Sequence, residues 1–368
     1  MFTRLYVDNY RCLVNFELKL GELTLLLGPN GVGKSSVLDV VFATRQLLNG
    51  IAKLTDPGIF PTTSLTRWQK NTTQVIEIDV LVGQDAMTYR LEVQHDRESR
   101  RARLMLERLS VDGQPLFECA AGTVQLYRDN HSAGPKYSVD WSESALARVA
   151  STKENTRLSA FLEAMRKVVV CRLYPSTFAG ECASEDPSLL RDGSNFAAWY
   201  RHFLQERPDL VAEFERTIAE VLPAFGKIRL EKVGQDTRAF LVSFGNGATR
   251  HELRLDELSD GQRALIAIYA LIHITRGQGY TLFLDEPENY VALSEIQPWL
   301  MALNDACGDG VPQAVLCSHH PELIDYLGAE RGVVLAREVG GAIVARALVP
   351  QAEKGSLKLS EAVSRGWQ

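Results

Sequence analysis

The sequence lacks the features that mark secreted, zinc-binding or membrane-spanning proteins. Its six cysteines are scattered, with no Cys-x-x-Cys pair and no zinc-ligand spacing, so we expect reduced, buried thiols. The N-terminus has no apolar run of the signal-peptide type. The longest apolar stretch, residues 264–274, falls well short of the roughly 20 residues that a membrane helix needs. These absences predict a cytoplasmic chain without a membrane segment.

Charge of one sign is also missing. The 368 residues carry 40 Lys and Arg against 46 Asp and Glu, which gives a formal net charge of −6. This balance argues against a protein that coats nucleic acid with its whole surface, but it allows a local basic patch. A hydrophobic content of 45% excludes wholesale disorder and is enough for a substantial core.

No internal repeat, low-complexity tract or sustained heptad pattern is present, so neither a solenoid nor a coiled-coil arm is expected. Instead, the order of apolar patterns predicts an α/β protein. Strand patterns near the N-terminus are followed by an antiparallel meander with turns at Gly83 and at Asp112-Gly113. Residues 142–168 and 195–222 have helical patterns, and residues 261–335 alternate between helix and strand, which is typical of a largely parallel sheet.

These patterns predict three segments. Residues 1–140 would form an N-terminal lobe with the antiparallel meander, residues 141–225 a helical lid insertion, and residues 226–368 a second lobe. The predicted fold class is therefore α/β, with a mixed, mostly parallel sheet, an N-terminal antiparallel β region and a helical insertion.

A phosphate-binding loop is the clearest motif. Residues 28–35 read Gly-Pro-Asn-Gly-Val-Gly-Lys-Ser and match the Walker A pattern, between a buried apolar strand and a helix. Glycines let backbone N–H groups surround the phosphates, Lys34 adds a positive charge, and the Ser35 hydroxyl is a ligand for Mg²⁺. The predicted phosphate-binding residues are Gly28, Asn30, Gly31, Gly33, Lys34, Ser35 and Ser36.

A Walker B pattern follows in the last third of the chain. Residues 281–286 form an apolar strand that ends in two carboxylates. Asp285 is predicted to hold the Mg²⁺ shell, and Glu286 to orient and polarise the attacking water. After the next strand, His319 is predicted to contact the γ-phosphate, whereas His320 is the better candidate for a structural histidine.

A third motif opens the apolar helix that precedes the Walker B strand. Ser259, Asp260, Gly261 and Gln262 combine a hydroxyl, a glycine and a helix N-terminus, which together make an anion site. An ordinary serine N-cap is the alternative. The short distance to the Walker B strand, in a chain with a P-loop, favours the anion site.

In this order, the motifs resemble the ABC-type ATPase heads of the SMC/RecF/OLD class, and within it the stand-alone AAA-type ATPases of bacterial genome-maintenance and anti-phage systems. Residues 190–197 resemble a motif of that branch, and Asn9-Tyr10-Arg11 is similar to its N-terminal element, which makes Asn9 and Arg11 candidate nucleotide contacts. Asp260 replaces the usual second signature glycine. No Q-loop glutamine stands at the expected place, which leaves Gln69 and Gln74 as candidates.

The resemblance implies a P-loop NTPase fold of the ABC-ATPase-head type, with residues 1–140 as the P-loop lobe and residues 226–368 as the signature and Walker B lobe. It also implies an ATPase that uses ATP and Mg²⁺ and closes as a homodimer. Ser259 and Gly261 would touch ATP bound at Lys34 of a partner chain, and hydrolysis would separate the two heads. The 49 residues after His319 are too few for a TOPRIM-type nuclease, so we expect a separate effector, a nuclease or a toxin, in anti-phage defence.

Three alternatives remain open. The first is a RecF-like repair ATPase that binds duplex DNA across the dimer, and the second is a nucleotide-gated scaffold with little turnover, against which the presence of Glu286 argues. A transporter ATPase fits worst, because a long insertion separates Lys34 from Ser259.

One arginine-rich segment could contact nucleic acid. Its five arginines are Arg97, Arg100, Arg101, Arg103 and Arg108. No aromatic residues interleave with them to stack on bases, so we favour a solvated turn whose arginines pair with Glu98, Glu107 and nearby acids.

Overall fold

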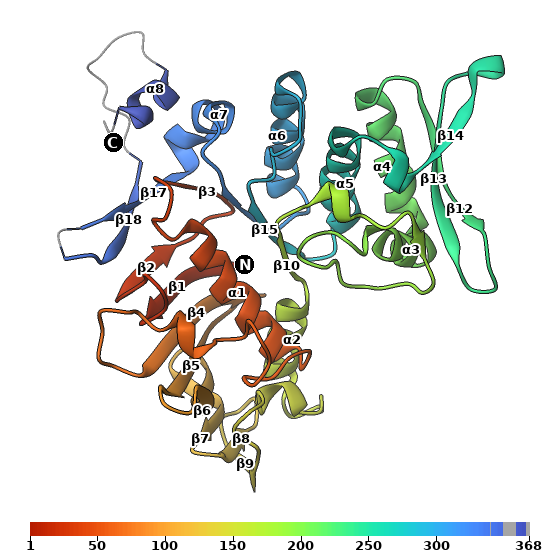
Figure 1. Ribbon diagram of the computed structural model, residues 1–368. Helices are drawn as coiled ribbons and strands as arrows, with labels where there is room; N and C mark the ends of the chain where they lie inside the picture. The colour runs from red at the N-terminus through yellow and green to blue at the C-terminus, as the bar shows by residue number, and fades with distance from the viewer. Residues whose placement is uncertain (339, 349–357, 366–368) are drawn as a thin grey trace. The chain divides into compact units, whose positions relative to one another are not determined.

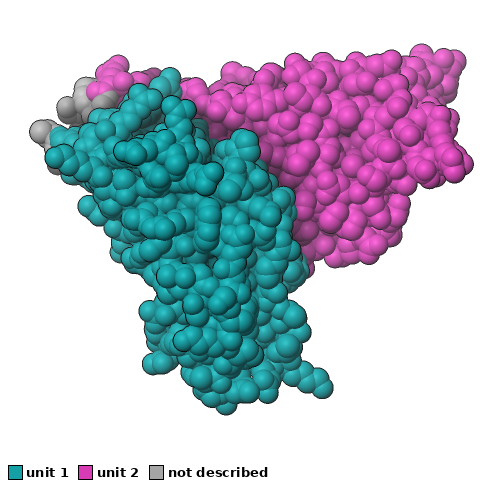
Figure 2. All heavy atoms as spheres, turned by 60° about the horizontal axis from the view of Figure 1, so that its bottom comes forward, with its two compact units in different colours: residues 1–168, 328–355, 367–368 teal, residues 169–327, 356–366 magenta. Residues whose placement is uncertain are grey.

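The computed structural model describes residues 1–338, 340–348 and 358–365, and the chain forms two compact units (Figure 1). Unit 1 holds residues 1–168 and the described residues of 328–355. Unit 2 holds residues 169–327 and the described residues of 356–366 (Figure 2). Within the described part of the chain, no helix is both long enough and apolar enough to cross a membrane.

Unit 1 is built mainly from β-strands. Its elements are β1 (Phe2–Asp8), β2 (Phe16–Lys19), β3 (Leu23–Leu27), α1 (Lys34–Leu48), η1 (Thr62–Ser64), β4 (Thr73–Val82), β5 (Asp85–Asp96), β6 (Arg101–Val111), β7 (Gln114–Ala120), β8 (Thr123–Tyr127), β9 (Ala133–Ser138), η2 (Leu146–Arg148), α2 (Thr156–Arg166), β17 (Gly332–Arg337) and β18 (Ile343–Ala347). Eight strands form one antiparallel sheet in the order β2-β1-β4-β5-β6-β7-β8-β9. Separately, β3 pairs in parallel with β17, which pairs antiparallel with β18.

The predicted meander is confirmed, and it is wider than expected. The β4–β5 hairpin turns at Gly83, whose φ is 62°. The β6–β7 hairpin turns at Asp112 and Gly113, with φ of 48° and 79°. Positive φ at both central residues matches the tight hairpin turn that follows the natural twist of paired strands. The strands β8 and β9 extend the sheet beyond the predicted region.

The helix predicted over residues 142–168 is wrong in its first half, because only Thr156–Arg166 is α-helical. The carboxylate of Asp129 accepts hydrogen bonds from the backbone N–H groups of Thr156 (2.8 Å) and Arg157 (3.1 Å), and this remote carboxylate sets the helix start. Upstream, the N–H groups of Ala145 and Leu146 donate to the buried carboxylate of Glu107 instead of to helix carbonyl groups. Tertiary hydrogen bonds therefore override a helical pattern here.

Unit 2 alternates helices and strands. Its elements are β10 (Val168–Cys171), η3 (Pro175–Thr177), β11 (Glu181–Cys182), α3 (Phe196–Glu206), α4 (Pro208–Val221), β12 (Phe225–Lys232), β13 (Arg238–Phe244), η4 (Gly247–Thr249), β14 (His251–Arg254), η5 (Leu255–Glu257), α5 (Asp260–Thr275), β15 (Thr281–Asp285), α6 (Leu293–Gly308), β16 (Gln313–Cys317), α7 (Pro321–Arg331) and α8 (Leu359–Ser364). Both β10 and α7 cross the boundary between the units by a few residues.

The central strands of unit 2 explain where its polar groups gather. All residues of β10, β15 and β16 are buried, as expected for continuous apolar runs in a covered sheet. β15 and β16 pair in parallel, with Asp285 opposite Cys317. Because the carboxyl ends of parallel strands lie at one edge, the residues that follow both strands meet there.

The three predicted segments do not coincide with the two units. The range 141–225 contributes η2 and α2 to unit 1 but α3 and α4 to unit 2. The division at residues 140 and 225 stays a prediction, because compact units and motif-bearing lobes are different descriptions of one chain.

Replacement of Glu107 on β6 tests how the large sheet is held to residues 144–146. Its buried carboxylate accepts hydrogen bonds from Tyr89 Oη (3.0 Å), Ser144 Oγ (2.5 Å) and the N–H groups of Ala145 (2.9 Å) and Leu146 (3.2 Å). We expect Glu107→Ala to lower the free energy of unfolding by about 3 kcal/mol, since four donors lose their acceptor. Urea denaturation measures this change.

The matched control is Glu118→Ala on the neighbouring strand β7, where the carboxylate is half-exposed and lies 3.7 Å from Arg108. We expect this control to change the unfolding free energy by no more than about 0.5 kcal/mol. Equal losses in the two variants would contradict a structural role for the Glu107 hydrogen bonds.

Candidate functional site

The loop between β3 and α1 has the backbone that a phosphate-binding loop needs. Gly28, Gly31 and Gly33 all have positive φ, of 141°, 78° and 104°. A Cβ added at Gly28 would lie 2.5 Å from the Leu335 carbonyl oxygen, and one at Gly33 would lie 2.8 Å from Cys12 Sγ. At these two positions, both conformation and space require glycine.

Lys34 and the first turn of α1 make the loop electropositive. The buried Lys34 side chain donates through Nζ to the carbonyl oxygens of Gly28 (2.7 Å) and Pro29 (3.3 Å). Among the described residues, no side chain caps the helix end at Gly33, and the first turn has no acidic residue. A helix N-terminus beside a lysine ammonium favours an anion. Asn30 is exposed, Ser35 is half-buried and Ser36 is buried.

Asn9 and Arg11 lie in the same unit but have different surroundings. Asn9 is buried at a φ of 61°, and its amide donates to the carbonyl oxygens of Asn71 (2.9 Å) and Thr73 (3.0 Å). These bonds give Asn9 a structural role in closing a turn. Arg11 is half-exposed and forms an ion pair with Asp39 on α1. Of the two, Arg11 is the more accessible to a ligand.

Gln74, one of the two Q-loop candidates, is fully engaged inside unit 1. Its buried Nε2 donates to Asn9 O (3.1 Å) and Ser64 Oγ (3.0 Å), and its Oε1 lies 2.9 Å from His95 Nε2. Gln69 is half-buried, and its carbonyl oxygen accepts a hydrogen bond from Arg97. The surroundings of Gln74 therefore favour a structural glutamine.

In unit 2, Glu286 stands at the end of the Walker B strand in an unusual conformation. Its φ is 48°, which is rare for a residue with a side chain, and its N–H donates to Cys317 O (2.8 Å) at the end of β16. This bond ties Glu286 to the neighbouring strand end. Asp285, one residue earlier, is the last residue of β15 and is buried.

Several side chains surround these two carboxylates. Arg172 lies 3.0 Å from Glu286 Oε2 through Nη2 and 3.5 Å from Asp285 Oδ2 through Nη1. Asn289 Nδ2 donates to Glu286 Oε2 (3.0 Å), and His319 Nδ1 lies 3.5 Å from Glu286 Oε1. The structure thus brings together three predicted residues, Asp285, Glu286 and His319. His319 is 62% exposed, so its other ring nitrogen can reach a ligand.

A third carboxyl group, on Glu288, lies behind this cluster. Ser318 Oγ donates to Glu288 and accepts from the His320 N–H (2.9 Å), while His320 Nδ1 accepts from the Glu322 N–H (3.2 Å) in the first turn of α7. Burial raises the pKa of the Glu288 carboxyl to about 7, and the charges of Glu286 and Asp285 add to this effect. These contacts give His320 the structural role that was predicted as its better alternative.

The signature residues form the start of α5 and are accessible. Ser259 Oγ accepts from the Gln262 N–H (3.3 Å), and Gln262 Oε1 accepts from the Ser259 N–H (3.1 Å), which is a capping box. Ser259 is exposed, and Asp260, Gly261 and Gln262 are half-buried. A Cβ on Gly261 would lie 3.0 Å from the carbonyl oxygen of Tyr290, in the loop after the Walker B strand.

Sequence reasoning missed Arg172 and Glu288. Arg172 directly follows the buried strand β10, so it stands at a strand end as Glu286 does. The only functional residue expected at that position was a Q-loop glutamine. Glu288 lies two residues after Glu286, and its carboxyl group gave no signal of its own in the sequence. The P-loop residues lie in unit 1, whereas the Walker B, His319 and signature residues lie in unit 2.

A family described as "AAA domain, putative AbiEii toxin, Type IV TA system" matches residues 23–325. Two solved structures share the fold. A structure of SmcHead bound to the C-winged helix domain of ScpA has a TM-score of 0.57 and 12% identity, covering 95% of this chain and 98% of that one. An Smc head domain with an extended coiled coil, bound to the C-terminal domain of ScpA derived from Pyrococcus furiosus, has a TM-score of 0.51 and 10% identity, covering 99% and 98%.

These two structures confirm the predicted fold class, an α/β P-loop ATPase of the head type with mixed sheets. Two characterised proteins match over short stretches. An OLD nuclease from Thermus scotoductus is 49% identical over 41 residues, 11% of this chain and 8% of that protein. The sulfate/thiosulfate import ATP-binding protein CysA 2 from Shewanella oneidensis is 46% identical over 46 residues, 12% and 13% of the two chains. The matches therefore span only a small part of either relative.

The raised pKa of Glu288 predicts a pH-dependent stability. Its pKa in the folded chain, about 7, lies above its ordinary value of 4.5. The folded state therefore keeps this proton longer than the unfolded state, and the stabilisation is lost as the pH rises through 7. As the pH rises from 5 to 8, we expect the unfolding free energy of the unchanged protein to fall by roughly 2–3 kcal/mol more than that of Glu288→Gln, which lacks the titrating carboxyl group.

Urea denaturation at the two pH values, without nucleotide or metal, measures this difference. Glu330→Gln on α7 is the control, because Glu330 is exposed and its removal leaves the pH dependence unchanged. A Glu288→Gln curve parallel to that of the unchanged protein across this range would show that the carboxyl group titrates normally.

Proposed function

The chain belongs to this AAA-domain family, whose members are P-loop ATPases of the SMC and OLD kind, and on that premise we propose that it binds ATP and hydrolyses it to ADP and phosphate. The observation that carries the proposal is the loop between β3 and α1. Three glycines with positive φ and a buried lysine at a helix N-terminus form a cradle for the phosphates. Gly28, Asn30, Gly31, Gly33, Lys34, Ser35 and Ser36 would contact them.

In the proposed hydrolysis, Glu286 is the general base. Its carboxylate would accept a proton from water as the water oxygen attacks the γ-phosphorus, and ADP would leave with the electrons of the broken P–O bond. Asn289 and Arg172 hold one carboxylate oxygen of Glu286, which leaves the other facing His319. His319 would contact the γ-phosphate, and Lys34 would stabilise the charge on the phosphate oxygens.

The chain's oxygen donors fit Mg²⁺. Ser35 offers a hydroxyl and Asp285 a carboxylate, both hard ligands of the kind that this ion prefers. Bound Mg²⁺ would neutralise charge on the phosphate oxygens. Asp285 is buried at a strand end, and Glu286 beside it is more accessible, which supports a metal-ligand role for Asp285 and a general-base role for Glu286.

We further propose that ATP joins two copies of the chain. Ser259, Asp260, Gly261 and Gln262 would contact ATP held at Lys34 of the partner copy. The exposure of Ser259 and the half-exposed start of α5 support this role, because a partner's ligand can reach them. Nucleotide-dependent closure would then switch the protein between two states.

For the biological role, we propose that this ATPase drives or gates a separate effector, a nuclease or a toxin, in anti-phage defence. The family description, which names a toxin of a type IV toxin–antitoxin system, and the short match to an OLD nuclease support this setting. The second candidate, a RecF-like ATPase that binds duplex DNA across the closed dimer, predicts ATP-dependent duplex binding with a steep salt dependence.

Glu286→Gln tests the proposed base. We expect the variant to bind ATP, to lose at least about 100-fold in turnover and to accumulate as a dimer, because proton acceptance is lost while the phosphate contacts remain. Phosphate release measures turnover, and light scattering after gel filtration with ATP and Mg²⁺ measures the dimer.

Glu206→Gln, at the exposed end of α3, is the matched control and is expected to hydrolyse ATP normally. An unchanged rate in Glu286→Gln would refute the assigned base. ATP binding without turnover in the unchanged protein would favour a nucleotide-gated scaffold.

A mixture of two inactive variants tests whether the signature acts on a partner's ATP. Lys34→Ala removes the phosphate-binding lysine, and Ser259→Arg blocks the signature. Each is expected to be inactive alone. A mixed dimer retains one intact P-loop facing one intact signature, so an equimolar mixture should recover roughly a quarter of the full rate.

The control mixture combines Lys34→Ala with the double variant Lys34→Ala, Ser259→Arg, which contains no intact P-loop and should stay inactive. If the first mixture recovers no more activity than this control, then Ser259 does not serve a partner's ATP.

A further inference from the structure

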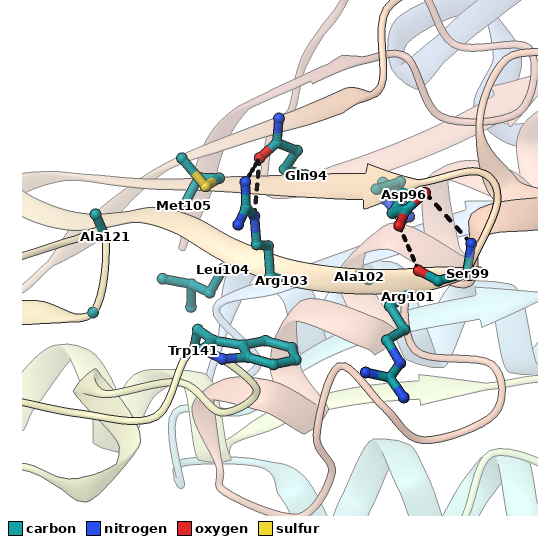
Figure 3. A pocket seen from close by; sticks show the side chains of 12 residues that line it. Gln94, Asp96, Ser99, Arg101, Ala102, Arg103, Leu104, Met105, Ala121 and Trp141 are labelled. Atoms are coloured by element: carbon teal, nitrogen blue, oxygen red, sulfur yellow. Dashed lines mark hydrogen bonds between the residues drawn. The ribbon is translucent and has the colours of Figure 1, made fainter.

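A groove in unit 1 is lined by residues of the arginine-rich segment and by none of the P-loop, Walker B or signature residues. It has a volume of about 950 Å³ and runs along the β5–β6 hairpin (Figure 3). The turn after β7 and the segment that follows β9 complete its walls. Its lining includes Asp96, Arg101, Arg103, Leu104, Gly122 and Trp141.

Trp141 presents an aromatic surface in this groove. Its side chain is 43% exposed, although tryptophan is among the largest apolar side chains. The position is fixed, because the Trp141 carbonyl oxygen accepts the N–H of Leu104 on β6 (2.9 Å). The next residue, Ser142, is also held, since its N–H donates to Asp140 Oδ1 (2.8 Å). The backbone that carries the indole is therefore held in place by hydrogen bonds.

Positive charge lies beside this indole. Arg101 and the Trp141 indole lie on the same side of β6 (Figure 3). Arg103 is held by Gln94, whose Oε1 accepts from Nε (3.0 Å) and Nη2 (2.5 Å), so its charge is fixed in place without being neutralised. Neither arginine forms an ion pair with Glu98 or Glu107 within the described residues, and Glu107 is occupied by other donors.

The other ionisable groups of the groove leave it net positive. Asp96 is the carboxylate that faces the arginines, and it already accepts hydrogen bonds from the Ser99 hydroxyl (2.6 Å) and the Glu98 N–H (2.9 Å). His95 is buried, and burial lowers its pKa to about 4, so it is neutral at physiological pH. Arg97 and Arg100 lie in the adjoining turn of the same hairpin.

We propose that this groove binds single-stranded nucleic acid, with a base stacked on Trp141 and backbone phosphates at Arg101 and Arg103. An aromatic face beside guanidinium groups matches the alternation of base and phosphate along such a strand. Arg101 and Arg103 are two residues apart on β6, so their Cα atoms stand about 6.7 Å apart along the strand. Arg101 extends to the side of β6 where Trp141 lies, and Arg103 extends toward Gln94 (Figure 3). A duplex keeps its bases stacked on one another, so it offers no free base face to the indole.

This inference does not depend on ATP hydrolysis, and it departs from the solvated turn that the sequence alone favours. That preference rested on the absence of aromatic residues among the arginines. The fold supplies the missing aromatic residue from a segment that follows three further strands.

Fluorescence anisotropy of a labelled oligothymidylate of about 12 nucleotides, with the full chain and without ATP, tests the proposal. Trp141→Ala should weaken binding about tenfold or more, and Trp141→Phe should largely restore it, since a phenyl ring also stacks. Arg101→Glu should weaken binding by a similar factor and lower its salt dependence. Without oligonucleotide, all of these variants should hydrolyse ATP at the rate of the unchanged protein.

The matched controls are Trp68→Ala, an exposed tryptophan outside the groove, and Arg166→Ala, an exposed arginine on α2. Both should bind the oligonucleotide normally. Affinity that is unchanged in Trp141→Ala and Arg101→Glu would overturn the proposal. So would equal affinity for a duplex of the same length, or a preference for polyglutamate that also depends on Arg101, which would indicate an acidic protein partner.

Discussion

Crowded negative charge at the end of β15 is the constraint around which unit 2 is arranged. Asp285, Glu286 and Glu288 lie within one short stretch, and Asp285 and Glu288 are buried. Like charges held this close repel one another unless a cation or a proton relieves them. Arg172 lies against two of these carboxylates, and the raised pKa of Glu288 lets the third carry a proton near neutral pH. The most accessible carboxylate of the cluster, that of Glu286, is held by Arg172 and Asn289.

The contacts that reduce this repulsion also orient the proposed general base. A general base must be ionised and must have a free oxygen directed at water. Arg172 and Asn289 both bind Oε2 of Glu286, so they orient the carboxylate while they stabilise its charge. The left-handed backbone of Glu286 belongs to this arrangement, because its N–H must reach Cys317 O while the side chain turns toward Arg172 and His319.

Local patterns predicted most of the fold. Buried apolar runs located β3, β15 and β16, and paired turn residues located the hairpins at Gly83 and at Asp112-Gly113. Each of these signals lies within a few residues of the element that it specifies. The helix predicted from residue 142 failed for the opposite reason. Its pattern was local, but Glu107 and Asp129, both distant in sequence, bind the backbone N–H groups that decide where a helix can start.

In the candidate site, too, residues close together in the sequence were predicted and contacts between distant residues were missed. Gly28, Gly33 and Lys34 follow one another in the chain, so their spacing alone predicted a phosphate loop whose backbone has the required conformation. Arg172 meets Glu286 only because β10 and β15 end near one another in the folded unit, and no spacing rule relates the two residues. Trp141 and the β6 arginines line one groove for the same reason, because the N–H of Leu104 on β6 binds the Trp141 carbonyl oxygen and brings a distant segment of the chain beside the strand. A search along the sequence for aromatic residues among arginines therefore tests the wrong neighbourhood, because β-sheets make neighbours of residues that the chain separates.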